Sequence, residues 1–384
     1  MAVSVGLQHL AASGRLAGQR VGLVCNPASV DEQWIHAVER IASVPEARLT
    51  ALFGPQHGFQ SDRQDDMIET PHARDAAQGV PVYSLYSETR TPTAEMLRDL
   101  DLLLIDLPDV GTRVYTYAST MANCLRACRQ HGVPVVVTDR PNPIGGVVVE
   151  GPLLDPSCAS FVGQFPIPLR HGLTIGELAR LFNDEFGIGA SLEVEPMTGW
   201  QRPMHFDETG LPWVLPSPNL PTLDSLLVFP GMVLLEGTNL SEGRGTTRPF
   251  ELFGAPWLDG ARLAERLNDA GLPGVRFRPV GFEPTFQKYA NTACGGCQIH
   301  IRDRCEFRPV RTALAVLDAC READPGRFAW RQPPYEYEHD RMPIDVLWGS
   351  DALRRAVEAE EPLLNALREP SENFLELRAR YLLY

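Results

Sequence analysis

The sequence contains few cysteines, no long apolar run and no basic tract, and each absence excludes a class of protein. Eight cysteines are scattered over 384 residues, a density too low for a disulfide scaffold. No stretch approaches the roughly 18 apolar residues of a membrane span, and the first residues lack the basic and apolar regions of a secretory signal. We therefore expect a soluble cytoplasmic protein with reduced thiols.

The charge balance argues against polyanionic partners. The 35 basic and 49 acidic residues give a formal net charge of −14, and no Lys/Arg-rich run is present. Long-range electrostatics therefore disfavours nucleic acid and anionic membranes. A small anionic substrate is still compatible with the sequence, because a few buried arginines can outweigh the net charge locally.

Several familiar functional motifs are missing as well. The sequence has no GxGxxG or GxxxxGK[ST] phosphate loop, no HExxH or EF-hand pattern, and no serine in GxSxG. Nucleotide binding and acyl-enzyme hydrolysis are thus disfavoured. Cys294 and Cys297 form the only CxxC, which lacks a partner pair for zinc. A redox dithiol there is less favoured than ordinary cysteines flanking a strand.

The first half of the chain alternates short apolar runs with helical patterns. The runs cover residues 20–25, 48–53, 80–86, 101–106 and 133–138. Helical patterns occupy 35–41 and 116–131, and Thr93 and Thr174 are expected helix caps, the latter with Glu177 at capping-box spacing. Apolar strands separated by helices predict a parallel sheet covered on both faces.

Length and the proline distribution predict two domains. A chain of 384 residues exceeds one ordinary core, and the proline cluster at 215–221 is the best linker candidate. Further α/β segments follow at 257–270, 275–280, 296–301 and 310–320. We expect an α/β fold, with a Rossmann-like parallel-sheet domain over residues 1–226 and a smaller α/β domain over 227–384.

Polar residues gather where the predicted parallel strands end, which is where such sheets bind ligands. They are Asn26, Gln56, His57, Asp106, Asp109, Asp139 and Asn142. For His57, a role in binding or acid–base chemistry and a role in fixing the loop are equally compatible with the pattern. The topology predicts a pocket at this edge.

Further loops carry candidate groups. Asp106, Asp109, Arg113 and Tyr115 suit a sugar site with an aromatic wall, or an Asp–Arg clamp that fixes the turn. His171 and Asn219 add polar groups on later loops.

Two glutamates stand out as possible acids or bases. Glu69 lies in an acidic run, for which a solvated loop is the simpler interpretation, while Glu150 follows an apolar run and precedes a glycine.

The most informative segment runs from Leu234 to Glu251. It places carboxylates and guanidiniums among glycines and threonines. Its polar side chains include Glu236, Asn239, Glu242, Arg244, Arg248 and Glu251. Glycines let backbone approach a ligand, arginine forks suit a carboxylate or phosphate, and glutamates transfer protons or orient hydroxyls. The alternative is a structural turn tied by salt bridges.

We interpret the segment as the second domain's contribution to a cleft, in which Glu236 and Glu242 hold the turn and a sugar. Polar and aromatic loops of this kind fit carbohydrate chemistry, where two carboxylates flank a glycosidic bond.

These segments together resemble the exo-β-N-acetylmuramidase family. The matching stretches are 52–59, 81–97 (PVYSLYSETRTPTAEML), 106–121 (DLPDVGTRVYTYASTM), 138–154 (TDRPNPIGGVVVEGPLL), 161–182, 216–224, 234–257, 335–338 (YEYE) and 343–349 (PIDVLWG). They extend from about residue 20 to about residue 350. Because many ordered segments carry the resemblance, it is specific.

The resemblance implies a Rossmann-like first domain with an active cleft, a smaller α/β second domain, and no cofactor or metal. It implies exo-hydrolysis of terminal non-reducing N-acetylmuramic acid (MurNAc) from peptidoglycan fragments such as MurNAc–GlcNAc and muropeptides, in cell-wall recycling. An arginine such as Arg244, Arg248 or Arg113 would bind the lactyl carboxylate. The expected substrate-binding residues are Asn26, Gln56, His57, Asp106, Asp109, Arg113, Tyr115, Asn142, His171, Asn219, Glu236, Asn239, Glu242, Arg244 and Arg248.

One position departs from the family pattern. Many members have Pro-Glu-His-Gly where this chain has Gln56. If that Glu is the general acid, another carboxylate must replace it, and we expect Glu69 and Glu150 as the catalytic pair, with Gln56 and His57 orienting the substrate. Gln56 also leaves open a non-catalytic muropeptide- or sugar-binding protein. A nucleotide-sugar or phosphosugar enzyme is less favoured, because the phosphate loop is missing.

Overall fold

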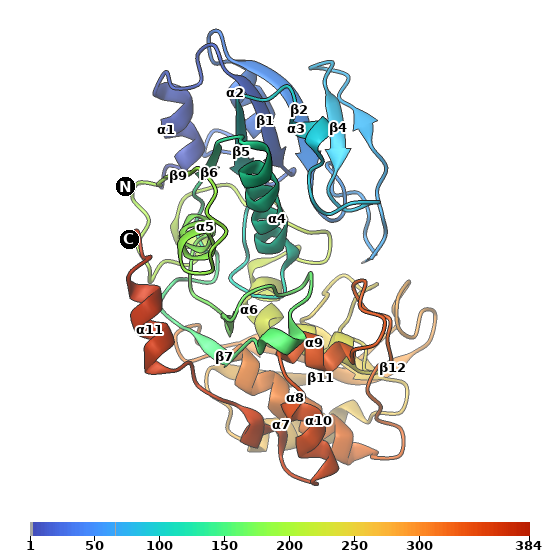
Figure 1. Cartoon of the computed structure of the whole chain (residues 1–384). Coiled ribbons are helices and arrows are strands. Elements are labelled where there is room, and N and C mark those ends of the chain that lie inside the picture. Colours follow the sequence, from blue (N-terminus) through green and yellow to red (C-terminus); the bar gives the residue numbers. More distant parts are fainter. Residues whose placement is uncertain (1–2, 66) are drawn as a thin grey trace.

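A sheet of seven strands organises the first half of the chain (Figure 1). In this computed structural model, which describes residues 3–65 and 67–384, the strand order is β3-β4-β2-β1-β5-β6-β9. The strands are β1 (Arg20–Cys25), β2 (Arg48–Gly54), β3 (Ala73–Arg74), β4 (Pro81–Ser84), β5 (Leu102–Asp106), β6 (Val135–Thr138) and β9 (Leu192–Glu195). All neighbours are parallel except the β3–β4 pair. The expected parallel sheet is confirmed.

Helices cover both faces of this sheet, because alternate residues of its central strands enter two different apolar cores. Leu23 of β1 packs in one core with α1 (Gly6–Ala12) and α2 (Ala37–Ala42). Its neighbour Val24 packs in the other core, which contains the following helices. They are α3 (Ala94–Leu97), α4 (Thr116–His131) and α5 (Ile175–Asp184). This double burial explains why the strands are continuous apolar runs.

Apolar runs and capping residues in the sequence predicted the positions of several elements closely. The predicted strand 20–25 and helix 116–131 coincide with β1 and α4. The capping box of α5 is present, since Thr174 Oγ1 accepts from the Glu177 amide (3.2 Å) and Glu177 Oε2 accepts from the Thr174 amide (3.0 Å). Thr93 caps α3 in the same way. Strand β9 was not predicted, since its sequence LEVE is polar and only partly buried.

The second half is built on a smaller antiparallel sheet of order β10-β12-β11. Its strands are β10 (Leu252–Ala255), β11 (Val275–Phe282) and β12 (Cys294–Ile301). The accompanying helices are α6 (Leu223–Met232), α7 (Gly260–Asp269), α8 (Pro309–Ala323), α9 (Pro343–Trp348), α10 (Ala352–Glu358) and α11 (Glu372–Ala379). A smaller α/β region therefore follows the Rossmann-like one, as expected. Within the described residues, no helix has the length and apolar character needed to cross a membrane.

The CxxC pair lies in β12. Residues three apart in a strand point to opposite faces, so Cys294 and Cys297 do not face each other. Burial raises the pKa of Cys294 to about 11 and that of Cys297 to about 12, which keeps both as unreactive thiols. The geometry favours ordinary strand cysteines over a redox dithiol.

The two halves share one apolar core, and the C-terminal end of the chain returns to the first half. The core that contains α4 and α5 continues into α6, α8 and α9. Helix α11 lies beside the first half (Figure 1), where Arg378 donates to the Gly172 carbonyl (2.7 Å) and Tyr384 donates to Asp139 (2.9 Å). The division at residue 226 falls within α6 and stays a proposal, with α11 returning across it.

We expect Gly231→Ala to destabilise the junction of the halves. Gly231 lies in α6, and a Cβ there would overlap the carbonyl oxygen of Pro309 at the start of α8. The free energy of unfolding should fall by about 3 kcal/mol. The control is Gly281→Ala, whose Cβ would meet nothing closer than the Cys294 carbonyl oxygen at 3.9 Å. Urea denaturation measures both, and equal effects would contradict the packing argument.

Candidate active site

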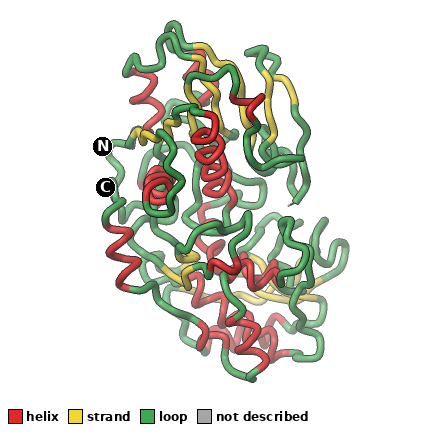
Figure 2. The backbone as a smooth tube through the Cα atoms, viewed as in Figure 1, coloured by secondary structure: helices red, strands yellow, loops and turns green. Residues whose placement is uncertain are grey.

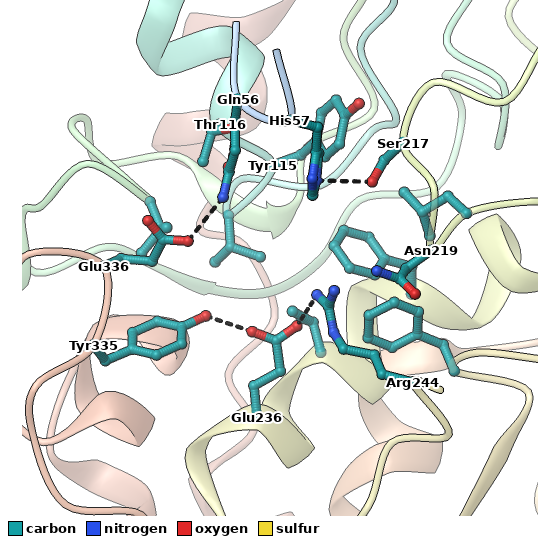
Figure 3. Close-up of a pocket in the computed structure, with 16 residues that line it drawn as sticks. Gln56, His57, Tyr115, Thr116, Ser217, Asn219, Glu236, Arg244, Tyr335 and Glu336 are labelled. Carbon is teal, nitrogen blue, oxygen red and sulfur yellow. Dashed lines mark hydrogen bonds and ion pairs between the residues drawn. The ribbon is translucent and has the colours of Figure 1, made fainter. Parts of the chain in front are cut away.

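A pocket lies between the two halves of the chain, and most of its lining residues belong to loops and turns. Figure 2 shows the long loops, in green, that connect the helices and strands of both halves. It is a small hollow, partly open to solvent. Its polar walls are Gln56, His57, Tyr115, Thr116, Ser217, Asn219, Glu236, Arg244, Tyr335 and Glu336 (Figure 3). Segments from both halves therefore build one site.

The proline-rich segment lies across the crevice in which topology places a ligand, and a second hollow remains there, lined by Ala28, Asp109 and Arg140 among other residues. The sheet order changes direction between β1 and β5, the usual position of such a crevice. There the Pro216 carbonyl accepts hydrogen bonds from Asn26 Nδ2 (2.9 Å), Tyr115 Oη (3.0 Å) and Tyr117 Oη (3.0 Å). Of the strand-end residues, only Gln56 and His57 line the pocket. Asp109, which follows β5, lines the hollow at the crevice instead.

Other strand-end residues hold turns together. Asp106 is paired with Arg140 through two hydrogen bonds (2.7 and 2.9 Å). Asp109 Oδ2 accepts from a backbone amide (2.6 Å) and lies 3.3 Å from His171 Nε2. Asn142 Nδ2 donates to a backbone carbonyl (2.9 Å). None of these four predicted residues lines the pocket, and their geometry supports positioning of loops.

Arg113 is held entirely within the protein. Its two terminal nitrogens donate to four backbone carbonyls, each at 2.9 Å, two of which belong to Leu347 and Trp348 of α9. Burial lowers the pKa of Arg113 to about 9. The side chain clamps the first half to α9, which leaves its predicted contact with a substrate carboxylate without geometric support.

The structure does not bring Glu69 and Glu150 together. Glu150, in β7 (Glu150–Leu153), is buried, and its Oε1 accepts from the Arg311 amide (2.8 Å); burial raises its pKa. The side chain of Glu69 is 54% exposed and lies near Arg90. Neither glutamate lines the pocket, so the expected catalytic pair is not assembled there.

A chain of buried charges fixes the segment 234–251. Arg244 Nη2 lies 2.6 Å from Glu236 Oε1, and Arg244 Nε lies 3.5 Å from Glu242 Oε1. Lys288, the only lysine in the sequence, donates to Glu242 (2.9 Å) and to the Leu235 and Leu240 carbonyls. A lysine ammonium offers three donors around one nitrogen, which matches these three acceptors. Glu242 therefore holds the turn behind the pocket, while Glu236 and Arg244 face it.

The glycines around Arg244 are required by backbone geometry. Gly243 and Gly245 have φ of 78° and 79°, a region that L side chains rarely adopt. A Cβ on Gly243 would lie 2.6 Å from the Leu252 carbonyl oxygen, and one on Gly245 would lie 2.6 Å from that of Phe286. Close packing on both sides presents the arginine between them to the pocket.

The remaining predicted residues of this segment are engaged elsewhere. Asn239 Nδ2 donates to the Arg327 carbonyl (2.7 Å), and its Oδ1 accepts from the Ala329 amide (3.0 Å). Arg248 lies 3.0 Å from Glu251. Neither lines the pocket, and Asn239 ties the segment to the backbone of residues 327–329.

Two carboxylates reach the pocket from different segments (Figure 3). Glu236 Oε2 accepts from the Tyr335 hydroxyl (2.6 Å), and Glu336 Oε1 accepts from Gln56 Nε2 (3.0 Å). The Gln56 amide is itself oriented, because its Oε1 accepts from Thr116 Oγ1 (2.7 Å). Sequence reasoning did not single out Tyr335 and Glu336; the signal for them was the YEYE segment at 335–338.

Backbone strain gathers around the same pocket. His57, Phe250 and Glu336 have φ of 71°, 64° and 44°, values uncommon for residues with a side chain. Tyr337, directly after Glu336, has φ of 68°. Such conformations persist where the surroundings over-determine them, and they cluster at functional sites.

His57 is neutral and already hydrogen-bonded on both ring nitrogens. Its Nδ1 lies 2.8 Å from the Arg63 carbonyl oxygen, so Nδ1 carries the proton and donates. Its Nε2 therefore accepts from Ser217 Oγ (3.0 Å). Burial and the nearby Arg244 lower the pKa of His57 to about 4. The ring fixes the β2 turn and Ser217, and it is a poor proton donor at neutral pH.

The chemistry available in the pocket follows from these groups. Glu236, Glu336 and Arg244 supply two carboxylates and one guanidinium, over an apolar floor that includes Phe229 and Phe250. In residues 3–65 and 67–384, no three His, Cys, Asp or Glu side chains gather in a way that could hold a metal ion. The arrangement suits a polar ring that carries an anionic substituent and is cleaved with two carboxylates at hand.

Two family models match the chain in sequence. The exo-β-N-acetylmuramidase NamZ N-terminal model covers residues 21–224, and the C-terminal model covers residues 227–384. The chain is also 46% identical over 373 residues to the peptidoglycan β-N-acetylmuramidase NamZ of Bacillus subtilis (strain 168), covering 96% of this chain and 88% of that protein.

Two solved structures from Bacteroides fragilis NCTC 9343, both described as DUF1343 family proteins, have the same fold. The first has a TM-score of 0.89 at 34% identity, and the second a TM-score of 0.77 at 26% identity. Each comparison covers 100% of this chain and 99% of the other.

The lowered pKa of His57 predicts a pH-dependent stability. The pKa of His57 is 6.5 in the unfolded chain and about 4 in the folded protein. Between these two pH values the unfolded chain binds more protons at this ring, so the free energy of unfolding falls as the pH falls. The loss is about 3 kcal/mol in full. We expect the stability advantage of wild type over His57→Gln to shrink between pH 7 and pH 4, as measured by urea denaturation. A constant difference would refute the assignment.

Proposed function

The chain belongs to the exo-β-N-acetylmuramidase NamZ family, and we propose that it removes terminal non-reducing MurNAc residues from peptidoglycan fragments. MurNAc–GlcNAc and small muropeptides are the proposed substrates, and cell-wall recycling in the cytoplasm is the proposed setting. The observation that carries this proposal is the pocket between the halves, where Glu236, Glu336 and Arg244 meet.

Arg244 is the group we assign to the lactyl carboxylate, which distinguishes MurNAc from GlcNAc. It lines the pocket, and its guanidinium is buried against Phe250, 5.1 Å from the ring centroid. A desolvated guanidinium binds a carboxylate more strongly than an exposed one. The other two arginines considered for this role, Arg113 and Arg248, do not line the pocket.

We assign the chemistry to Glu236 and Glu336 in place of Glu69 and Glu150. Glu336 is placed to exchange a proton with the glycosidic oxygen or with water, since Gln56 orients its Oε1 and the Tyr86 hydroxyl lies 2.7 Å from its Oε2. Glu236, ion-paired with Arg244, is placed to stabilise positive charge that develops at the anomeric carbon. In this scheme Gln56 serves as an orienting amide, and Glu336 supplies the carboxyl chemistry.

Parallel glutamine substitutions separate the two pairs of glutamates. We expect Glu236→Gln and Glu336→Gln to lower kcat on MurNAc–GlcNAc by about 10³-fold, because general acid–base and electrostatic terms are of that size. Glu150→Gln is the matched control, with kcat expected within about 10-fold of wild type, because Glu150 does not line the pocket. Glu69→Gln tests the other member of the replaced pair and should lose far less than the pocket variants. Release of free MurNAc is the readout, and thermal denaturation checks folding. Full activity of either pocket variant removes that residue from the mechanism.

Substrate discrimination tests Arg244. We expect Arg244→Gln to reduce kcat/KM for a MurNAc glycoside about 10²-fold more than for the matching GlcNAc glycoside, because a charge-assisted pair is lost only with the former. Kinetics on the two chromogenic glycosides give the ratio. An equal loss on both substrates would show that Arg244 acts only through its pair with Glu236.

A further inference from the structure

An arginine–tyrosine platform lies directly outside the pocket. It consists of Arg90, Tyr337 and Glu69, backed by Tyr86 and Phe161. The Arg90 guanidinium carbon lies 3.1 Å from the centre of the Tyr337 ring. Glu69 Oε1 lies 3.2 Å from Arg90 Nη2 and 3.4 Å from the Tyr337 hydroxyl. Tyr337 is 38% exposed, so this charged and aromatic surface is accessible.

The platform is continuous with the pocket through Tyr86. The Tyr86 hydroxyl donates to Glu336, and its ring centroid lies 5.7 Å from that of Tyr337 and 5.9 Å from that of Phe161. Glu336 and Tyr337 are consecutive, both with positive φ. This strained turn places Glu336 at the pocket and its neighbour on the platform.

The platform is held in place before any ligand arrives. The Arg90 carbonyl accepts from Asn123 Nδ2 of α4 (3.1 Å), and the side chain of Arg90 is only 22% exposed. Its guanidinium is fixed by the ion pair with Glu69 and by stacking on Tyr337. A surface of this kind loses little side-chain freedom on binding.

We propose that the platform binds the sugar on the leaving side of the cleaved bond, an uncharged N-acetylamino sugar. This inference rests on the proposed function, because removal of a terminal residue held in the pocket leaves the next sugar outside it, beyond Glu336. Sugar rings have apolar C–H faces that pack on aromatic and guanidinium planes, and polar edges that hydrogen-bond to carboxylates and guanidiniums. Because Arg90 and Glu69 carry opposite charges that pair with each other, the platform favours an uncharged ligand. Glu69 then contacts the departing sugar and takes no part in proton transfer.

The test compares substrates with and without a leaving sugar. We expect Tyr337→Ala and Arg90→Ala to lower kcat/KM for MurNAc–GlcNAc by about 10-fold or more, since stacking and cation–π contacts are of that order. MurNAc fluoride has a leaving group of one atom and no leaving sugar. Its kcat/KM should therefore change less than about twofold. Tyr337→Phe keeps the ring and should lose less on the disaccharide than Tyr337→Ala. Trp34→Ala, at an aromatic residue that is 66% exposed and outside the pocket and platform, is the control.

Three outcomes would overturn the subsite. They are equal losses on both substrates, no loss on the disaccharide, and a loss confined to muropeptides that carry a peptide stem, which would assign the platform to the peptide. Failure of the proposed function is distinguishable, because wild type would then hydrolyse neither substrate. In that case calorimetry decides the subsite. Wild type should bind MurNAc–GlcNAc more tightly than MurNAc, and Tyr337→Ala should abolish this difference; equal affinities in wild type would contradict the proposal.

Discussion

The chain of buried charges from Glu236 through Arg244 and Glu242 to Lys288 is the interaction on which the site depends. Each charge has an opposite neighbour, which is the condition under which ionised groups are tolerated away from water. Removing one member would strand its partner, at a cost of about 3–5 kcal/mol. The glycines beside Arg244 allow the backbone turns that bring these charges together. The single lysine of the sequence lies where three acceptors converge, and its three donors match them.

The position of the site follows from how the two halves are joined. The proline-rich segment caps the strand ends of the Rossmann-like sheet, with Pro216 as the shared acceptor of three buried donors. The pocket that holds Glu236 and Glu336 lies toward the second half, where one apolar core and the Arg113 clamp hold α9 and the surrounding loops against the first half. A cleft built from both halves positions Gln56 beside Glu336, although the two residues are far apart in sequence.

Local sequence signals predicted the elements well and the site only in part. Strand β1, helix α4 and the cap of α5 follow from apolar runs and capping residues, which are local. Gln56, His57, Tyr115, Asn219, Glu236 and Arg244 were anticipated and line the pocket. Asp106, Arg113 and Asn142 were anticipated too, yet they satisfy polar groups of turns. A polar side chain after a strand looks the same in sequence whether it serves a loop or a ligand. Glu336 was missed because its partner Gln56 is brought to it only by the packing of the two halves.

We expect a MurNAc ring to lie in this pocket with its anomeric carbon between Glu236 and Glu336. A crystal structure of the protein with MurNAc bound tests this placement most directly. We predict the lactyl carboxylate on Arg244 and the anomeric carbon facing both glutamates, whose separation would then indicate retention at about 5–5.5 Å or inversion at about 6.5–9.5 Å. A ring bound instead beneath the proline-rich segment, or with its anomeric carbon nearest Glu69 or Glu150, would contradict the account.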